Sequence, residues 1–150
     1  MIRTFSTLLA ISALACFANA ADKKLQMKDL SPAVQKTIQE NLKGAQVTGI
    51  GKEVEKGVTQ YEVETMLNGK HRDFEVDTKG TLLVVEDETS IDEIPAAAKA
   101  SIMKKVGSGK LGMVETVNKA DTKLYEAAYT SKDGKKHEVL VTADGTETKD

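Results

Sequence analysis

The chain has 150 residues, a formal net charge of −2 and an aromatic content of only 4%. Its lysines are balanced by acids and are not interleaved with aromatic residues, so the composition excludes a nucleic-acid-binding protein of the usual basic kind. With so few aromatic residues the core must be aliphatic, and a unit of about 60 residues that folded alone would bury only about 60% of its surface.

Residues 1–20 have the pattern of a cleaved export signal. Arg3 provides a short positive region, residues 8–17 are apolar but too few to span a bilayer, and Ala18-Asn19-Ala20 is a small-residue cleavage pattern. We expect cleavage after Ala20, an N-terminal extension over residues 21–27, and no transmembrane segment in the mature chain. Because the removed segment holds one basic and no acidic residue, 20 basic and 23 acidic residues remain, a net charge of −3.

The only cysteine, Cys16, lies within this signal. It would carry the lipid in a lipoprotein signal, but Ala13 stands three residues before it, where Leu is usual. We therefore expect periplasmic or secreted export without a lipid anchor. A mature chain without cysteine has no disulfide and no thiolate chemistry, so its stability must come from packing.

The first predicted helix starts at a good N-cap, Ser31. Pro32 suits the first helical turn, apolar residues recur every four positions through Leu42, and Gly44 ends the helix. The apolar period then changes from four to two, which predicts antiparallel strands near residues 46–54, 59–67, 70–77 and 81–86. In the first of these strands apolar residues stand three apart beside glycine, which predicts a β-bulge.

The pair Asn68-Gly69 predicts a type I′ hairpin between the second and third strands. Counting outward, Val63 pairs with Phe74 and both face the helix. The side that faces away carries two opposed carboxylate pairs, Glu62 opposite Glu75 and Glu64 opposite Asp73. Such pairs repel by about 0.2–1 kcal/mol each, so a partner that neutralised them would recover that energy.

The turn after the third strand is expected to bring apolar residues to the same side. It places Thr81 opposite Asp77, and therefore Leu83 beside Glu75 and Val85 beside Asp73. The candidate partner-binding residues are Glu62, Glu64, Asp73, Glu75, Leu83 and Val85. In the alternative interpretation, lysines and water screen the charges, and the two apolar residues pack against the second half of the chain.

An acidic run, Glu86-Asp87-Glu88 followed by Asp92 and Glu93, connects the two halves of the chain. It lacks the alternating Asp or Asn ligands and the central glycine of an EF-hand calcium loop. We interpret it as a solvated linker that leads into the next helix.

The second half repeats the plan of the first. Pro95 opens a helix that ends at Gly107, and strands are expected near residues 110–118, 123–131, 135–142 and 146–149. A three-residue loop around Asp133-Gly134 pairs Tyr125 with Val141. The positions that then face away from the helix are Glu126, Ala128, Glu138 and Leu140.

The two halves repeat at a spacing of about 64 residues. Ser31-Pro32-Ala33 returns as Ile94-Pro95-Ala96, Tyr61-Glu62 as Tyr125-Glu126, and Gly80-Thr81 as Gly145-Thr146. With Asn68-Gly69-Lys70, these motifs resemble the PepSY family, and more narrowly its secreted β-lactamase-inhibitor-like members. The resemblance covers nearly all of residues 28–150 and departs from the family at the polar last strand. It implies a small exported module found in protease propeptides and proposed inhibitors, without catalytic residues to carry over.

Catalytic and metal-binding motifs are missing from the sequence. His71 and His137 are single histidines, and neither a nucleophile elbow nor a glycine-rich phosphate loop occurs. We therefore expect no catalytic residue, no metal site and no cofactor.

The sequence thus predicts an α+β fold of two tandem helix-plus-antiparallel-sheet modules, residues 28–90 and 91–150. The leading hypothesis is a non-enzymatic exported protein that binds another extracytoplasmic protein through the exposed sheet face, modulating or inhibiting an enzyme such as a protease. The alternative is a sensor that binds a small ligand or a divalent cation with its acidic sheet face. A calcium-dependent rise in melting temperature that Glu64→Ala removes would favour the sensor.

Overall fold

The computed structural model describes residues 25–55 and 57–148. The expected export signal, including Cys16, lies outside the described residues. The elements in chain order are η1 (Met27–Asp29), α1 (Pro32–Leu42), β1 (Gln46–Glu55), β2 (Val58–Leu67), β3 (Lys70–Asp77), β4 (Leu82–Thr89), α2 (Ala96–Val106), β5 (Lys110–Lys119), β6 (Thr122–Thr130), β7 (Lys136–Val141) and β8 (Glu147–Thr148).

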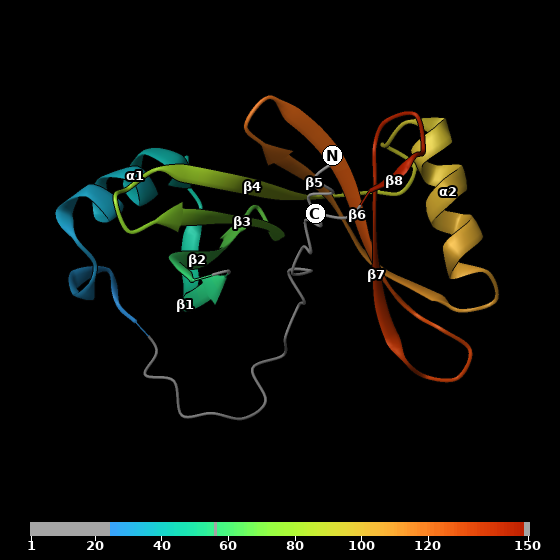
Figure 1. The fold of residues 1–150 in the computed structure, drawn as a ribbon, viewed down its shortest axis with the longest axis horizontal. Helices are drawn as coiled ribbons and strands as arrows, with labels where there is room; N and C mark the ends of the chain where they lie inside the picture. The colour runs from blue at the N-terminus through green and yellow to red at the C-terminus, as the bar shows by residue number, and fades with distance from the viewer. Residues whose placement is uncertain (1–24, 56, 149–150) are drawn as a thin grey trace, which may run out of the picture.

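In the part of the chain that the structure describes, eight antiparallel strands form one continuous sheet in the order in which they occur (Figure 1). The prediction of an α+β fold with two tandem helix-plus-sheet modules is wrong. β4 pairs with β5, with Val84 opposite Lys119 at one end and Thr89 opposite Val114 at the other, and this pairing merges the halves. The fold is therefore dominated by its sheet. The physical reason is that two separate sheets would leave β4 and β5 as exposed edges, and their pairing removes both.

Both helices lie against the same face of the sheet, one toward each end (Figure 1). The cluster under α1 includes Val34, Ile38, Val63, Phe74 and Val76. The cluster under α2 includes Ala98, Ile102, Val114, Ala127 and Val139. On β4, Val85 packs with the first cluster and Thr89 pairs with Val114 of the second; four residues apart on one strand, they point to the same side.

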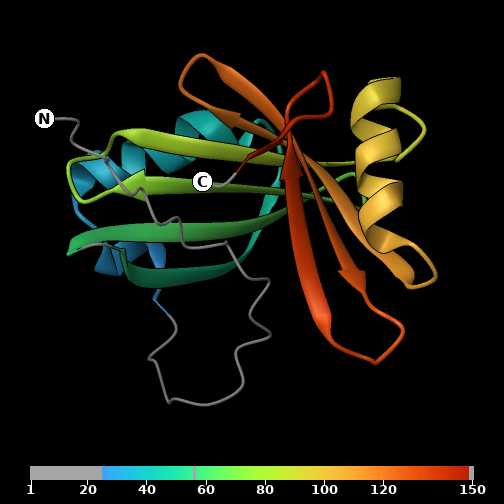
Figure 2. The same ribbon diagram turned by 45° about the vertical axis from the view of Figure 1, so that its right-hand side comes forward.

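The strands of the two halves run in clearly different directions (Figure 2). The change of direction follows from the right-handed twist of strands, which accumulates from one neighbour to the next across a wide sheet. The face opposite the helices is therefore strongly twisted rather than flat.

The helices begin and end where the sequence predicts them. Ser31 is the N-cap of α1, and its Oγ accepts a hydrogen bond from the Val34 amide at 3.4 Å. The chain leaves α1 through left-handed conformations at Lys43 (φ 48°) and Gly44 (φ 95°). α2 starts directly after Pro95 and is followed by Gly107 at its C-cap.

Each helix is bonded to a turn that lies far along the chain. Thr37 Oγ1 donates to the Gly80 carbonyl at 2.5 Å, and Ser101 Oγ donates to the Gly145 carbonyl at 2.6 Å. A Cβ at Gly80 would lie 2.8 Å from the backbone carbonyl of Ala33, and one at Gly145 would lie 2.6 Å from the oxygen of Ala97. Both turns therefore require glycine so that the helix can approach this closely.

Most of the predicted strand pairing is confirmed. Val63 is opposite Phe74 and Tyr125 is opposite Val141, as the hairpin loops predict. The predicted bulge occurs in β1 between Val47 and Gly49. β8 is short and polar, in agreement with its sequence.

The interpretation of residues 86–88 as a solvated linker is wrong, because they belong to β4. Glu86 is opposite Val117, and Glu88 is opposite Glu115. Three consecutive acidic residues show no apolar pattern in the sequence, although every second residue of β4 faces the helices in the structure.

Candidate functional site

The face of the sheet opposite α1 and α2, here called the open face, carries an array of carboxylates that crosses both halves of the molecule. Its positions follow from the strand register, which places Glu62 opposite Glu75, Glu88 opposite Glu115, and Glu115 opposite Glu126. Among the described side chains, the acidic residues of the open face are Glu53, Glu62, Glu64, Asp73, Glu75, Glu86, Glu88, Glu115, Glu126 and Glu138. Four of them are in the predicted acidic group; Glu53 extends it to β1, and the others extend it across β4 to β7.

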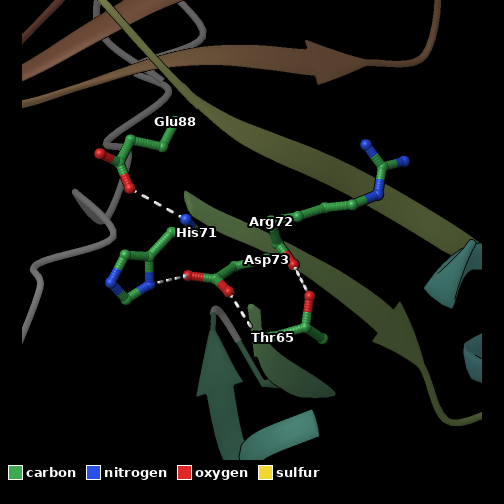
Figure 3. Close-up of polar contacts among 5 residues, drawn as sticks. All are labelled: Thr65, His71, Arg72, Asp73 and Glu88. Atoms are coloured by element: carbon green, nitrogen blue, oxygen red, sulfur yellow. Dashed lines mark hydrogen bonds and ion pairs between the residues drawn. The ribbon is translucent and has the colours of Figure 1, made fainter. Parts of the chain in front are cut away.

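The expected pairing of Glu64 with Asp73 is replaced by a local break in the ladder (Figure 3). Asp73 Oδ1 accepts a hydrogen bond from the Thr65 amide at 2.6 Å, and Thr65 Oγ1 donates to the Arg72 carbonyl. Glu64 lies beside β1 over Gly49, where a Cβ would meet its carboxylate. Asp73 is thus buried and bonded to the neighbouring strand, and it offers little surface to a partner.

Next to this break the side chains divide between the two faces (Figure 3). His71 Nδ1 lies 3.5 Å from Asp73 Oδ2, and the His71 amide donates to Glu88 Oε2 at 2.9 Å. Arg72 points the other way and forms an ion pair with Asp87. Burial raises the pKa of Asp73, although the hydrogen bond from Thr65 and the nearby His71 act to lower it. The only arginine described on these strands therefore does not neutralise the open face.

The register expected for β4 is wrong by one residue. Thr81 is opposite Asp77 as predicted, since the Asp77 amide donates to the Thr81 carbonyl at 2.9 Å. A bulge then occurs between Glu75 and Val76 of β3, and it shifts the following pairs. Val85 consequently packs with the α1 cluster, and Val84 is opposite Glu75 on the open face.

An apolar strip runs along the open face between the acids. It consists of Val84, Val117, Leu124 and Leu140, one residue from each of β4 to β7, with Leu83 packed against it. Val117 is opposite both Glu86 and Leu124, so the strip and the carboxylates share the same rows of the sheet. Of the two apolar residues predicted for the surface, Leu83 joins this strip and Val85 does not.

Three glutamates of the open face, Glu62, Glu86 and Glu115, hold protons more tightly than ordinary glutamates. Burial raises the pKa of Glu86 to about 9, and the charge of Glu115 raises it further than any other neighbour does. Burial also raises the pKa values of Glu62 and Glu115 to about 7; the strongest charge acting on Glu62 is that of Glu53, and on Glu115 it is that of Asp73. A cation brought to this face would therefore displace protons.

The histidines and carboxylates do not converge on a metal centre in the described part of the chain. Within residues 25–55 and 57–148, no group of three or more His, Asp and Glu side chains is placed to hold a metal ion. His71 lies at the open face, whereas His137 stacks on Tyr129 in the second half, with ring centroids 5.1 Å apart. The two histidines therefore do not act as one site.

Sequence reasoning missed that the acidic residues of the two halves form one surface. Glu126, Glu138 and Leu140 were predicted to face away from the helix, and the structure confirms their pairing. Joining them to the acids of the first half required the β4 and β5 pairing. Residues 84–89 gave no signal of this pairing, because Glu86, Asp87 and Glu88 are all acidic and hide the period of two that is typical of a strand.

Solved structures with a similar fold are known. A proposed periplasmic protein from Bacteroides eggerthii aligns over 80% of this chain and 86% of its own, with 17% identity and a TM-score of 0.64. A DUF2874 family protein from Bacteroides uniformis aligns over 79% and 86%, with 15% identity and a TM-score of 0.63. The chain shares their fold.

A third similar structure is a BLIP-like protein from Bacteroides fragilis, named for its likeness to a β-lactamase inhibitor. It aligns over 79% of this chain and 83% of its own, with 20% identity and a TM-score of 0.58. No family model and no curated protein matches the sequence. In the part of the chain that the structure describes, no helix has the length and apolar character needed to cross a membrane.

Proposed function

We propose that this protein is a non-enzymatic, exported binding protein whose open face docks on another extracytoplasmic protein. The observation that carries the proposal is the array of partly exposed carboxylates on one face that neither α1 nor α2 covers. Charge gathered on such a face selects a partner of complementary charge.

The class of partner that we propose is an extracytoplasmic enzyme, such as a protease, that the protein modulates or inhibits. Support comes from the fold shared with a BLIP-like protein and from similar structures described as periplasmic. The partner class rests on an analogy of fold, and the activity of a captured protein tests it.

We also propose that residues 28–90 and 91–150 are two copies of one PepSY-like unit. Thr37 with Gly80 and Ser101 with Gly145 make the same contact between helix and turn in both halves, which supports a common origin. The bulges at equivalent places in β1 and β5 support it as well.

The experiment that tests the binding function is capture of partners by the immobilised mature chain from an extracytoplasmic extract of its own source. A double variant, Glu62→Gln with Glu115→Gln, alters the open face. The matched control, Glu40→Gln with Asp121→Asn, also replaces two carboxyl groups by amides, at exposed positions on α1 and on the turn after β5. We expect the parent chain and the control to retain a protein that the open-face variant releases. Activity of the captured protein is then measured with and without the chain.

Equal recovery by all three forms would show that the open face is not the binding surface. A captured enzyme whose activity is unchanged by the chain would leave the protein a binder but contradict the modulating role.

A further inference from the structure

The turn between β2 and β3 consists of Asn68 and Gly69, two residues whose functional groups can react with each other. Both have the positive φ that a two-residue type I′ turn requires, 54° at Asn68 and 82° at Gly69, and both are exposed. Leu67 and Lys70 pair on either side of them and close the ladder. The two turn residues therefore lie outside the strands, where local opening of a fold costs least free energy.

The reacting groups of this pair are accessible. The structure records no hydrogen bond from the Gly69 amide to any described residue, and glycine has no side chain to shield its nitrogen. A Cβ built at Gly69 would have no atom within 4 Å. The side-chain amide of Asn68 therefore has room to rotate toward the Gly69 nitrogen.

The other described asparagines lack these features. Asn41 lies in α1, and its Nδ2 donates to the Thr37 carbonyl at 2.8 Å. Asn118 lies in β5 between two neighbouring strands, where it is opposite Val85 and Lys123. In both places the backbone belongs to a helix or a sheet, and the following residue carries a side chain that hinders attack by its nitrogen.

The equivalent turn of the second half is protected in another way. Asp133 precedes Gly134 there, and its carboxylate accepts a hydrogen bond from Ser131 Oγ and forms an ion pair with Lys135 at 2.9 Å. The hydrogen bond from Ser131, followed by the contact with Lys135, lowers the pKa of Asp133, so its side chain is ionised at neutral pH. A nitrogen attacks an ionised carboxylate poorly, whereas the amide of Asn68 carries no charge.

We propose that Asn68 is a site of spontaneous deamidation and that this modification loosens the hairpin formed by β2 and β3. The Gly69 nitrogen gives its proton to water and bonds to Cγ of Asn68. The bond from Cγ to Nδ2 then breaks, and ammonia leaves with a proton taken from water. A further water molecule opens the succinimide ring at one of its two carbonyls, which leaves either aspartate or isoaspartate. Water is the only reagent consumed, and asparagine is one of the residues that react in this way on heating.

Isoaspartate affects the fold because this turn sets the register of the hairpin. It lengthens the main chain by a carbon atom between the two turn residues, whereas aspartate leaves the length unchanged. The pairing of Val63 with Phe74, both buried under α1, is counted from this turn, as is that of Glu62 with Glu75 on the open face. A lengthened turn therefore disturbs the core and the acidic surface together.

The experiment is prolonged storage of the mature chain at neutral pH, below its melting temperature, followed by peptide mass mapping and an enzymatic assay for isoaspartate. We expect a mass increase of about 1 Da in the peptide that contains Asn68, with isoaspartate among the products. Reaction at Asn41 and Asn118 should be at least about tenfold slower. The control is Asn68→Gln, whose longer side chain does not close the five-membered ring, and its peptide should acquire neither signal.

A parallel sample in urea separates the effect of the structure from that of the sequence. Because the turn is exposed, Asn68 should react in the folded chain within about tenfold of its rate in the unfolded chain. An unmodified Asn68 in the folded sample would overturn the inference. A folded rate at Asn68 no higher than that at Asn41 and Asn118 would overturn it as well.

The variant Asn68→Asp separates the added charge from the lengthened chain. Since Asp-Gly forms the same type of turn, the variant should fold with the parent register. The isoaspartate form of the parent, isolated by ion exchange, should melt at least about 2 °C below this variant. Equal melting temperatures of the two would contradict the loosening of the hairpin.

Discussion

Glu88 and Glu115 lie directly opposite each other on the strand pair that joins the two halves of the sheet. Glu115 is in turn opposite Glu126 on β6, so three carboxylates stand in one row across three strands. Like charges placed directly across a strand pair destabilise a sheet. The pairing that unites the fold is therefore sensitive to the protonation of its own side chains.

The first prediction is that the free energy of unfolding rises as the pH is lowered from about 9 to about 5. Glu86 has its pKa raised from 4.5 to about 9, so the folded chain binds a proton that the unfolded chain has lost. Stability from such a group is complete below the unfolded pKa and is lost as the pH rises through the folded one, with a slope of at most about 1.4 kcal/mol per pH unit. Urea unfolding at several pH values measures it.

The same titration should turn over in acid. Hydrogen bonds from their turns lower the pKa values of Asp77 and Asp144, so their contribution is present above the unfolded pKa and is lost as the pH falls below it. We expect maximal stability near pH 5. A stability that is constant or increases between pH 5 and 9 would contradict the protonation of the open face.

The second prediction concerns Glu86→Gln, which replaces a disfavoured carboxylate by a neutral side chain of the same shape. At pH 9 we expect the variant to be more stable than the parent by up to about 5 kcal/mol, because above pH 5 the parent must take up a proton on folding that the variant does not need. At pH 5, where Glu86 is protonated, the difference should nearly vanish. Glu40→Gln on exposed α1 is the control and should change stability by less than about 0.5 kcal/mol at either pH. An equal change in the free energy of unfolding for the two variants at pH 9 would contradict the raised pKa of Glu86.

The third prediction tests the contacts between helices and turns. Gly80→Ala should destabilise the fold by more than about 2 kcal/mol, since its φ is +89° and the new Cβ would lie 2.8 Å from the Ala33 backbone. Gly69→Ala is the matched control, because φ is +82° there and no atom lies within 4 Å of the added Cβ. It should show only the left-handed penalty of about 1–2 kcal/mol. Thermal unfolding of both variants provides the comparison, and equal losses would mean that the helix approach is unimportant.

The fourth prediction concerns the break in the ladder at Thr65. Thr65 is fully buried, and its hydroxyl donates to the Arg72 carbonyl, so Thr65→Val removes the hydrogen bond while keeping the shape. We expect a loss of about 1–2 kcal/mol in the free energy of unfolding. Thr48→Val, at an exposed bulge position of β1, should have almost no effect. Hydrogen exchange of the Thr65 amide, which donates to Asp73, should also accelerate in the first variant but not in the second.

Local signals in the sequence were sufficient for most of the elements. Ser31 and Pro32 predict the start of α1 because capping is a property of a few adjacent residues. Asn68-Gly69 predicts the pairing of Val63 with Phe74 because the geometry of the turn fixes the register nearby. Such features need no knowledge of distant segments.

The errors arose where the outcome depends on partners far along the chain. No glycine in β4 predicts the bulge between Glu75 and Val76. Because of this bulge, Val84 lies on the open face and Val85 faces the helices, the opposite of the prediction. The pairing of β4 with β5 joins strands separated by α2, so no turn motif announces it. The candidate surface was consequently predicted as four acids on one hairpin, whereas the carboxylates extend across both halves.

The bond between Thr37 and Gly80 has a consequence for how the chain assembles. Val34 and Ile38 of α1 have no exposed surface in the finished fold, but the strands that cover them are complete only when the segment through Gly80 is present. When the chain is synthesised from its N-terminus, the apolar face of α1 therefore stays exposed until more than forty further residues have been added. During that interval this face is accessible to a chaperone.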